Sequence, residues 1–217
     1  MNYIFYWYTL YGDDMLFIVG LIFICYLYLM TQGHIINEMR CFSVFLCFLL
    51  SLCIKDEVYS KDDVVKIQWT LLFILVADYC LFNPDMYYVG ILFYIMVMSI
   101  LFLFVYKPIC FVGEAFIIIS LLFSLSFEVI VTFYSFMLLG LCLVSCLKRE
   151  FHLVAFLFLF LVSDFFIALS YITTIDYTYL SWSLYVPALL VLLLPYFRKT
   201  RKVQRVLLQL FEKNSII

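Results

Sequence analysis

The sequence predicts an all-α membrane protein, a bundle of eight transmembrane helices with both termini in the cytoplasm. Of the 217 residues, 68% are hydrophobic and only 13% are charged, and the mean hydropathy is +1.15. A soluble domain is about half apolar and about a quarter charged, so the composition excludes that class. Two further observations give the number of spans and their direction: the lengths of the apolar runs and the placement of the basic residues.

The apolar runs are long enough to be membrane spans, which need about 20 mostly apolar residues. Eight such runs are present, and we expect them to form one bundle over residues 1–197. The stretch 109–147 is too long for one helix, so we expect a hairpin that turns near residues 124–126. The eight predicted spans are residues 15–30, 36–54, 64–82, 87–106, 109–125, 127–147, 151–171 and 180–196.

The basic residues indicate the direction of the spans, because cytoplasmic loops carry an excess of Lys and Arg. With eight spans and a cytoplasmic C-terminus, twelve of the thirteen basic residues lie in cytoplasmic segments, and only Arg40 lies outside. Asp62 and Asp63 are predicted to form the acidic first turn of a helix. We expect an integral multi-pass protein of a bacterial cell membrane.

The tail, residues 198–217, combines six basic residues with apolar residues at helical spacing. This pattern predicts an amphipathic helix on the anionic inner leaflet. The simpler interpretation is an ordinary topology anchor.

Two aspartates lie inside predicted spans. Asp78 lies in the third span within the sequence VADY, and Asp164 lies in the seventh within VSDF. A carboxylate at that depth costs roughly 2.5–3.5 kcal/mol, so it indicates a functional site. The matching contexts, four spans apart, suggest an internal four-helix repeat. At 1.5 Å of rise per residue, both carboxylates are expected about 20 Å from the inner end of their spans.

Three roles are open for this pair. Carboxylates that share a site ionise one after the other, which provides a general acid beside a general base for the hydrolysis of a lipid ether or ester. The same pair suits a small transporter or proton-coupled carrier. Alternatively, each aspartate only bonds a neighbouring helix and specifies packing. Glu128, near the outer start of the sixth span, is a further candidate for the site.

The cysteines and histidines give no sign of a metal or cofactor. None of the eight cysteines forms a Cys-x-x-Cys pair, and His34 and His152 fall on opposite sides of the predicted membrane. We therefore expect no metal and no cofactor. The membrane explains the basic tail, so no nucleic-acid partner is expected, and the oligomeric state stays open.

The two aspartate segments carry a resemblance to a known family. Residues 71–81 read LLFILVADYCL and are followed by Gly90 and Phe93, and residues 155–168 read AFLFLFLVSDFFIA. With eight short-looped spans, this pattern resembles the YhhN-like lysoplasmalogenases, of which the chain looks like a divergent member. The resemblance covers most of the chain in topology and rests on about a dozen residues.

The sequence also departs from that family's pattern at three places. Ala77 stands where a glycine usually precedes the first aspartate, and residues 95–99 offer no counterpart of a histidine common in the fourth span. In the last span Tyr185 and Ala188 fit a Tyr-x-x-Ala-Gln pattern, but Leu189 replaces the glutamine.

The resemblance implies a lipid-active enzyme. Its members hydrolyse the vinyl ether bond of a lysoplasmalogen, releasing a fatty aldehyde and a glycerophospho-headgroup. On that basis Asp78 and Asp164 are the expected acid and base, in either order. A transporter using the same aspartates, or a non-catalytic relative, is the alternative. The residues expected to position the substrate are Tyr79, Ser163, Tyr185 and Glu128.

Overall fold

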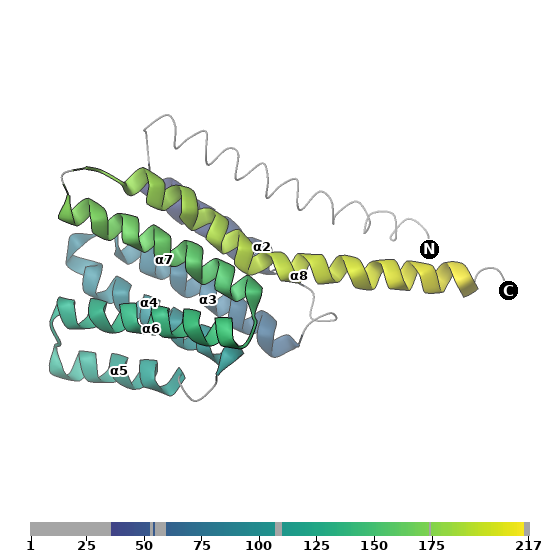
Figure 1. Ribbon diagram of the computed structural model, residues 1–217, viewed down its shortest axis with the longest axis horizontal. Coiled ribbons are helices and arrows are strands. Elements are labelled where there is room, and N and C mark those ends of the chain that lie inside the picture. The colour runs from purple at the N-terminus through teal and green to yellow at the C-terminus, as the bar shows by residue number, and fades with distance from the viewer. Residues whose placement is uncertain (1–35, 53, 55–59, 107–109, 174, 215–217) are drawn as a thin grey trace.

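The computed structural model describes residues 36–52, 54, 60–106, 110–173 and 175–214, and in them it contains α-helices and one short 3-10 helix but no strand. The predicted all-α class is confirmed for this part of the chain (Figure 1). The predicted first span, residues 15–30, lies outside the described residues. The elements are α2 (Ile36–Leu52), α3 (Lys61–Cys80), η1 (Pro84–Met86), α4 (Tyr87–Val105), α5 (Cys110–Phe123), α6 (Phe127–Leu147), α7 (Phe151–Ile172) and α8 (Thr178–Asn214).

Several of these helices match the dimensions of a lipid bilayer. In the described part of the chain, four helical stretches are long and apolar enough to cross a membrane, and two shorter helices are also apolar. The protein is therefore a helical membrane protein. The four stretches are Pro84–Val105, Phe127–Leu147, Phe151–Ser170 and Thr178–Tyr196, and the shorter helices are Cys41–Leu52 and Phe111–Phe123.

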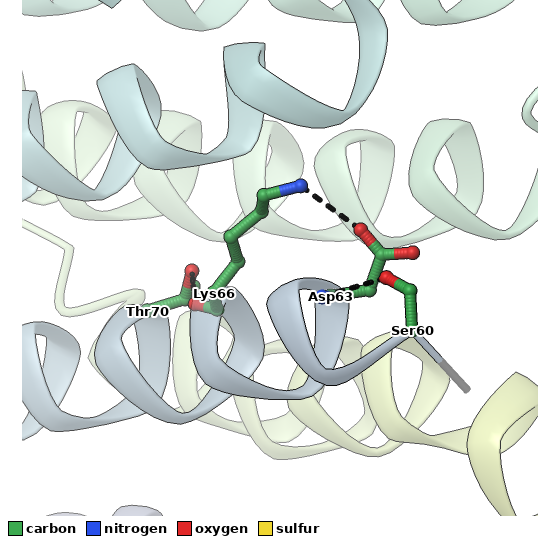
Figure 2. Close-up of polar contacts among 4 residues, drawn as sticks. All are labelled: Ser60, Asp63, Lys66 and Thr70. Carbon is green, nitrogen blue, oxygen red and sulfur yellow. Dashed lines mark hydrogen bonds and ion pairs between the residues drawn. The ribbon is translucent and has the colours of Figure 1, made fainter. Parts of the chain in front are cut away.

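The start of α3 shows why this helix begins before its apolar part. The Ser60 side chain accepts a hydrogen bond from the backbone N–H of Asp63 at 3.2 Å and so caps the helix (Figure 2). Asp62 and Asp63 lie in the first turn, as predicted, where they complement the helix dipole. Lys66 Nζ donates to Asp63 Oδ1 at 2.9 Å, and the Thr70 hydroxyl donates to the Lys66 carbonyl oxygen at 2.8 Å.

The predicted hairpin at residues 124–126 is present. Helix α5 ends at Phe123, and α6 begins at Phe127 after the N-cap residue Ser126. Ser124 has a positive φ of 46°, which reverses the chain between the two helices.

Six helices pack in a closed ring. Following the contacts, α8 packs on α2, α2 on α3, α3 on α4, α4 on α6, α6 on α7 and α7 on α8. Helix α5 packs outside this ring on α4 (Figure 1). Its Phe116 ring stacks on Phe133 of α6 with a centroid distance of 3.6 Å. Large buried side chains fill the bundle, including Phe102, Phe156 and Phe160.

The order of helices in the ring has a twofold character. Moving three places around the ring takes α2 to α6, α3 to α7 and α4 to α8, so helices four apart in chain order lie opposite each other. This is the order that an internal four-helix repeat would produce. The two helices that carry the aspartates, α3 and α7, therefore occupy equivalent places.

The last helix is longer than the predicted span. Helix α8 has 37 residues and continues without a break across the predicted boundary at residue 197, past the end of the bundle (Figure 1). The segment after that boundary is rich in Arg, Lys, Gln and Leu, which favour helix, so no local signal ends the helix where the apolar run ends.

Candidate functional site

Asp78 is completely buried, and two tyrosines bind its carboxylate. It lies near the end of α3 and is 0% exposed. The Tyr94 hydroxyl donates to Oδ1 at 2.5 Å, and the Tyr185 hydroxyl donates to Oδ2 at 2.7 Å. The two hydroxyl oxygens are 3.1 Å apart. These three residues, here called the Asp78 cluster, join α3, α4 and α8.

A glycine allows α4 to approach α3 closely beside this cluster. A Cβ atom on Gly90 would meet the Leu81 side chain at 2.8 Å and the Ala77 carbonyl oxygen at 3.1 Å. Gly90 lies one turn before Tyr94 and therefore on the same side of α4. The close approach of the helices is consistent with the short hydrogen bond between Tyr94 and Asp78.

Asp164 lies on α7 and is half-buried. Its Oδ2 atom accepts a hydrogen bond of 2.6 Å from the hydroxyl of Tyr134 on α6. The Tyr134 side chain is itself buried, with 7% of its surface exposed. We call these two residues the Asp164 pair.

Aromatic rings connect the Asp78 cluster to the Asp164 pair. The Tyr94 and Tyr134 rings lie in contact, with centroids 5.9 Å apart. Phe160, one turn before Asp164 on α7, packs on Tyr94 at 5.7 Å and on Tyr185 at 5.4 Å. The structure therefore brings both aspartates to one aromatic centre, and tyrosine side chains link the two carboxylates.

The remaining predicted site residues lie at different places. Of these, Tyr185 joins the Asp78 cluster. The buried Ser163 hydroxyl bonds the carbonyl oxygen of Ser181 at 3.0 Å and its hydroxyl at 2.9 Å, so it connects α7 to α8. Tyr79 is 67% exposed, and Glu128 is exposed in the first turn of α6. Neither Tyr79 nor Glu128 therefore belongs to the buried centre.

Tyr94 and Tyr134 were not identified from the sequence. They are two of 18 tyrosines in a chain in which aromatic residues make up 21%. The available signal was physical: a tyrosine hydroxyl inside an apolar span requires a hydrogen-bond partner. In the structure, Tyr94 is the eighth residue of α4 and Tyr185 is the eighth residue of α8.

Other features of the molecule lie apart from this centre. A groove of about 380 Å³ between α5 and α6 is lined only by apolar residues, among them Phe111, Phe116 and Phe133. Among the residues that the structure describes, no group of three or more His, Cys, Asp or Glu side chains could hold a metal ion.

The fold and the site together define a helical membrane protein in which two aspartate–tyrosine units meet inside the bundle. No family model, curated protein or solved structure matches this sequence.

Proposed function

We propose that this protein is a membrane-embedded lipid hydrolase resembling the YhhN-like lysoplasmalogenases. It cleaves the vinyl ether bond of a lysoplasmalogen and releases a fatty aldehyde and a glycerophospho-headgroup. The observation that carries the proposal is the meeting of Asp78 and Asp164 at one aromatic centre. The resemblance of the two aspartate segments to that family gives the substrate class.

The chemistry of a vinyl ether suits this centre. A general acid protonates the double-bond carbon remote from the oxygen, and water then adds to the resulting oxocarbenium ion with the help of a base. Carboxyl groups supply both functions without a metal ion or a redox cofactor. The Tyr94 and Tyr134 hydroxyls donate hydrogen bonds that fix the positions of the two carboxyl groups.

The proposal includes a topology of eight spans with both termini in the cytoplasm of a bacterial cell. In this topology residues 15–30 form the first span. The asymmetric distribution of the thirteen basic residues supports the topology. In this topology α3 and α7 run in the same direction, from the inner to the outer side. The substrate enters from the surrounding bilayer, in which lysophospholipids dissolve.

The direct test is aldehyde release by the purified full-length protein in phospholipid vesicles. We expect the wild type to release aldehyde from choline or ethanolamine lysoplasmalogen. It should not cleave the matched alkyl-ether and acyl lysolipids, which lack the double bond. The variant with both Asp78→Asn and Asp164→Asn is the matched control and should be inactive.

The same assay separates the proposal from its alternatives. If the wild type releases no aldehyde while a known lysoplasmalogenase does so in parallel, the hydrolase function is excluded. Proton flux across the same vesicles that requires the aspartates would then indicate a carrier. If neither aldehyde release nor proton flux is observed, the remaining role for the aspartates is helix packing.

A further inference from the structure

The two aspartates occupy equivalent helices but have different surroundings. Tyr94 and Tyr185 stand at the same position of α4 and α8, the two helices that the twofold order of the ring exchanges. A symmetric site would assign one of these tyrosines to each aspartate. Instead both hydroxyls bind Asp78. Asp164 is bound by Tyr134, which lies on α6 and not on α8.

The two aspartates also differ in how deeply their side chains are buried. Asp78 is 0% exposed and is closed off by α3, α4 and α8. Asp164 is half-buried on α7, and its neighbour Phe165 is 60% exposed on the outer surface of the bundle. Of the two carboxyl groups, Asp164 therefore keeps surface that a molecule outside the bundle can contact, whereas Asp78 has none.

From this asymmetry we infer that Asp164 is the carboxyl group that touches the substrate, whereas Asp78 is a positioning residue. The inference rests on the proposed function and assigns the acid and base roles that the sequence leaves open. Asp164 acts first as the general acid and then as the general base. Asp78 stays bound to its two tyrosines throughout.

One carboxyl group is sufficient for the reaction. The Asp164 carboxyl proton is transferred to the remote vinyl carbon, where a C–H bond forms from the π electron pair and leaves an oxocarbenium ion. Water adds to the carbon of that ion and returns a proton to the Asp164 carboxylate. The hemiacetal then breaks its bond to the glycerol oxygen, which takes the hydroxyl proton, so that vinyl ether and water give aldehyde and alcohol.

Asp78 acts through the rings that surround Asp164. Its hydrogen bond fixes Tyr94, whose ring packs on Tyr134, the donor to Asp164. Tyr94 also packs on Phe160, one turn before Asp164 on α7. Breaking the hydrogen bond between Asp78 and Tyr94 therefore shifts the reactive carboxyl without removing a group that contacts the substrate.

The test uses a membrane-soluble carbodiimide, which modifies protonated carboxyl groups that it can reach from the lipid. The full-length protein in vesicles is labelled, and the modified peptides are quantified by mass spectrometry. The same peptides from protein labelled after denaturation are the reference for reactivity. We expect label on Asp164 and none on Asp78. Label on Asp78 equal to or above that on Asp164 would overturn the assignment.

Kinetics of the variants provide the second part of the test. Asp164→Asn should lower kcat by about 10²–10⁴-fold, the usual contribution of a general acid. Asp78→Asn and Tyr94→Phe should each lower kcat by roughly 10²-fold or less, as expected for misplacement, with KM nearly unchanged. Tyr106→Phe, at the C-terminal end of α4 and exposed, is the control and should match the wild type.

The outcomes distinguish the assignment from the function on which it rests. An Asp164→Asn variant with wild-type kcat, or a folded Asp78→Asn variant as inactive as Asp164→Asn, contradicts the assignment. If the wild type cleaves no lysoplasmalogen but the label still falls on Asp164 alone, the proposed reaction fails. The assignment of Asp164 as the reachable carboxyl then stands.

Discussion

Replacing Tyr94 with phenylalanine removes one of the two hydroxyls that bind the buried Asp78 carboxylate. The lost hydrogen bond is 2.5 Å long, and the carboxylate has no exposed surface. A hydrogen bond to a charged group contributes about 1.5–3 kcal/mol to stability, and we expect Tyr94→Phe to cost that amount. For a chain of this size, that corresponds to a fall of about 3–12 °C in the melting temperature.

The assay is unfolding of the purified protein in detergent micelles, with two matched tyrosine controls. Tyr88→Phe removes a neutral hydrogen bond of 2.8 Å to the Ser120 carbonyl oxygen and should cost about 0.5–1.5 kcal/mol. Tyr79→Phe alters an exposed side chain and should change stability by about 0.5 kcal/mol or less. A Tyr94→Phe variant as stable as Tyr79→Phe would refute the role of this hydrogen bond.

Two further substitutions test how the helices pack. Gly113→Leu should destabilise the contact between α5 and α4 by about 1–3 kcal/mol, because a Cβ atom there would meet the Ser99 hydroxyl oxygen at 1.9 Å. Gly140→Ala, where the nearest atom is 3.9 Å away, should be tolerated in the same unfolding assay. Ser163→Ala removes the hydroxyl contact between α7 and α8 and should cost about 0.5–1.5 kcal/mol. Ser183→Ala, whose hydroxyl bonds only within its own helix turn, should cost less, and equal losses would contradict the role of Ser163.

Much of the fold could be predicted from the sequence because lipid leaves the backbone few choices. Backbone groups in a bilayer must bond within their own segment, so each apolar run becomes a helix. The turn near Ser124 followed from length alone, since the stretch 109–147 exceeds one span. A helix in the tail was also predicted, but not that it continues from the last span without a break, because the apolar run ends near residue 196 while helix propensity does not.

The site could be predicted only in part. The aspartates were identifiable because a carboxylate in an apolar run is costly, whatever its surroundings. Their hydrogen-bond partners were not, because Tyr94 lies 16 residues and Tyr185 lies 107 residues from Asp78 along the chain. Such contacts depend on which helices become neighbours in the ring. The position of Ser163 next to Asp164 suggested a shared role, but its hydroxyl turns to α8 instead.

The measurement that tests the central claim most directly is hydrolysis of lysoplasmalogen by the wild type in D2O, with the aldehyde reduced at once to the alcohol. In D2O the carboxyl group carries a deuteron, which it transfers to the vinyl carbon remote from the ether oxygen. After reduction, this carbon is C2 of the fatty alcohol and holds one deuterium. The account predicts this singly labelled product and its loss in Asp164→Asn. Absence of aldehyde, or an aldehyde without that deuterium, would contradict acid-catalysed hydrolysis at this site.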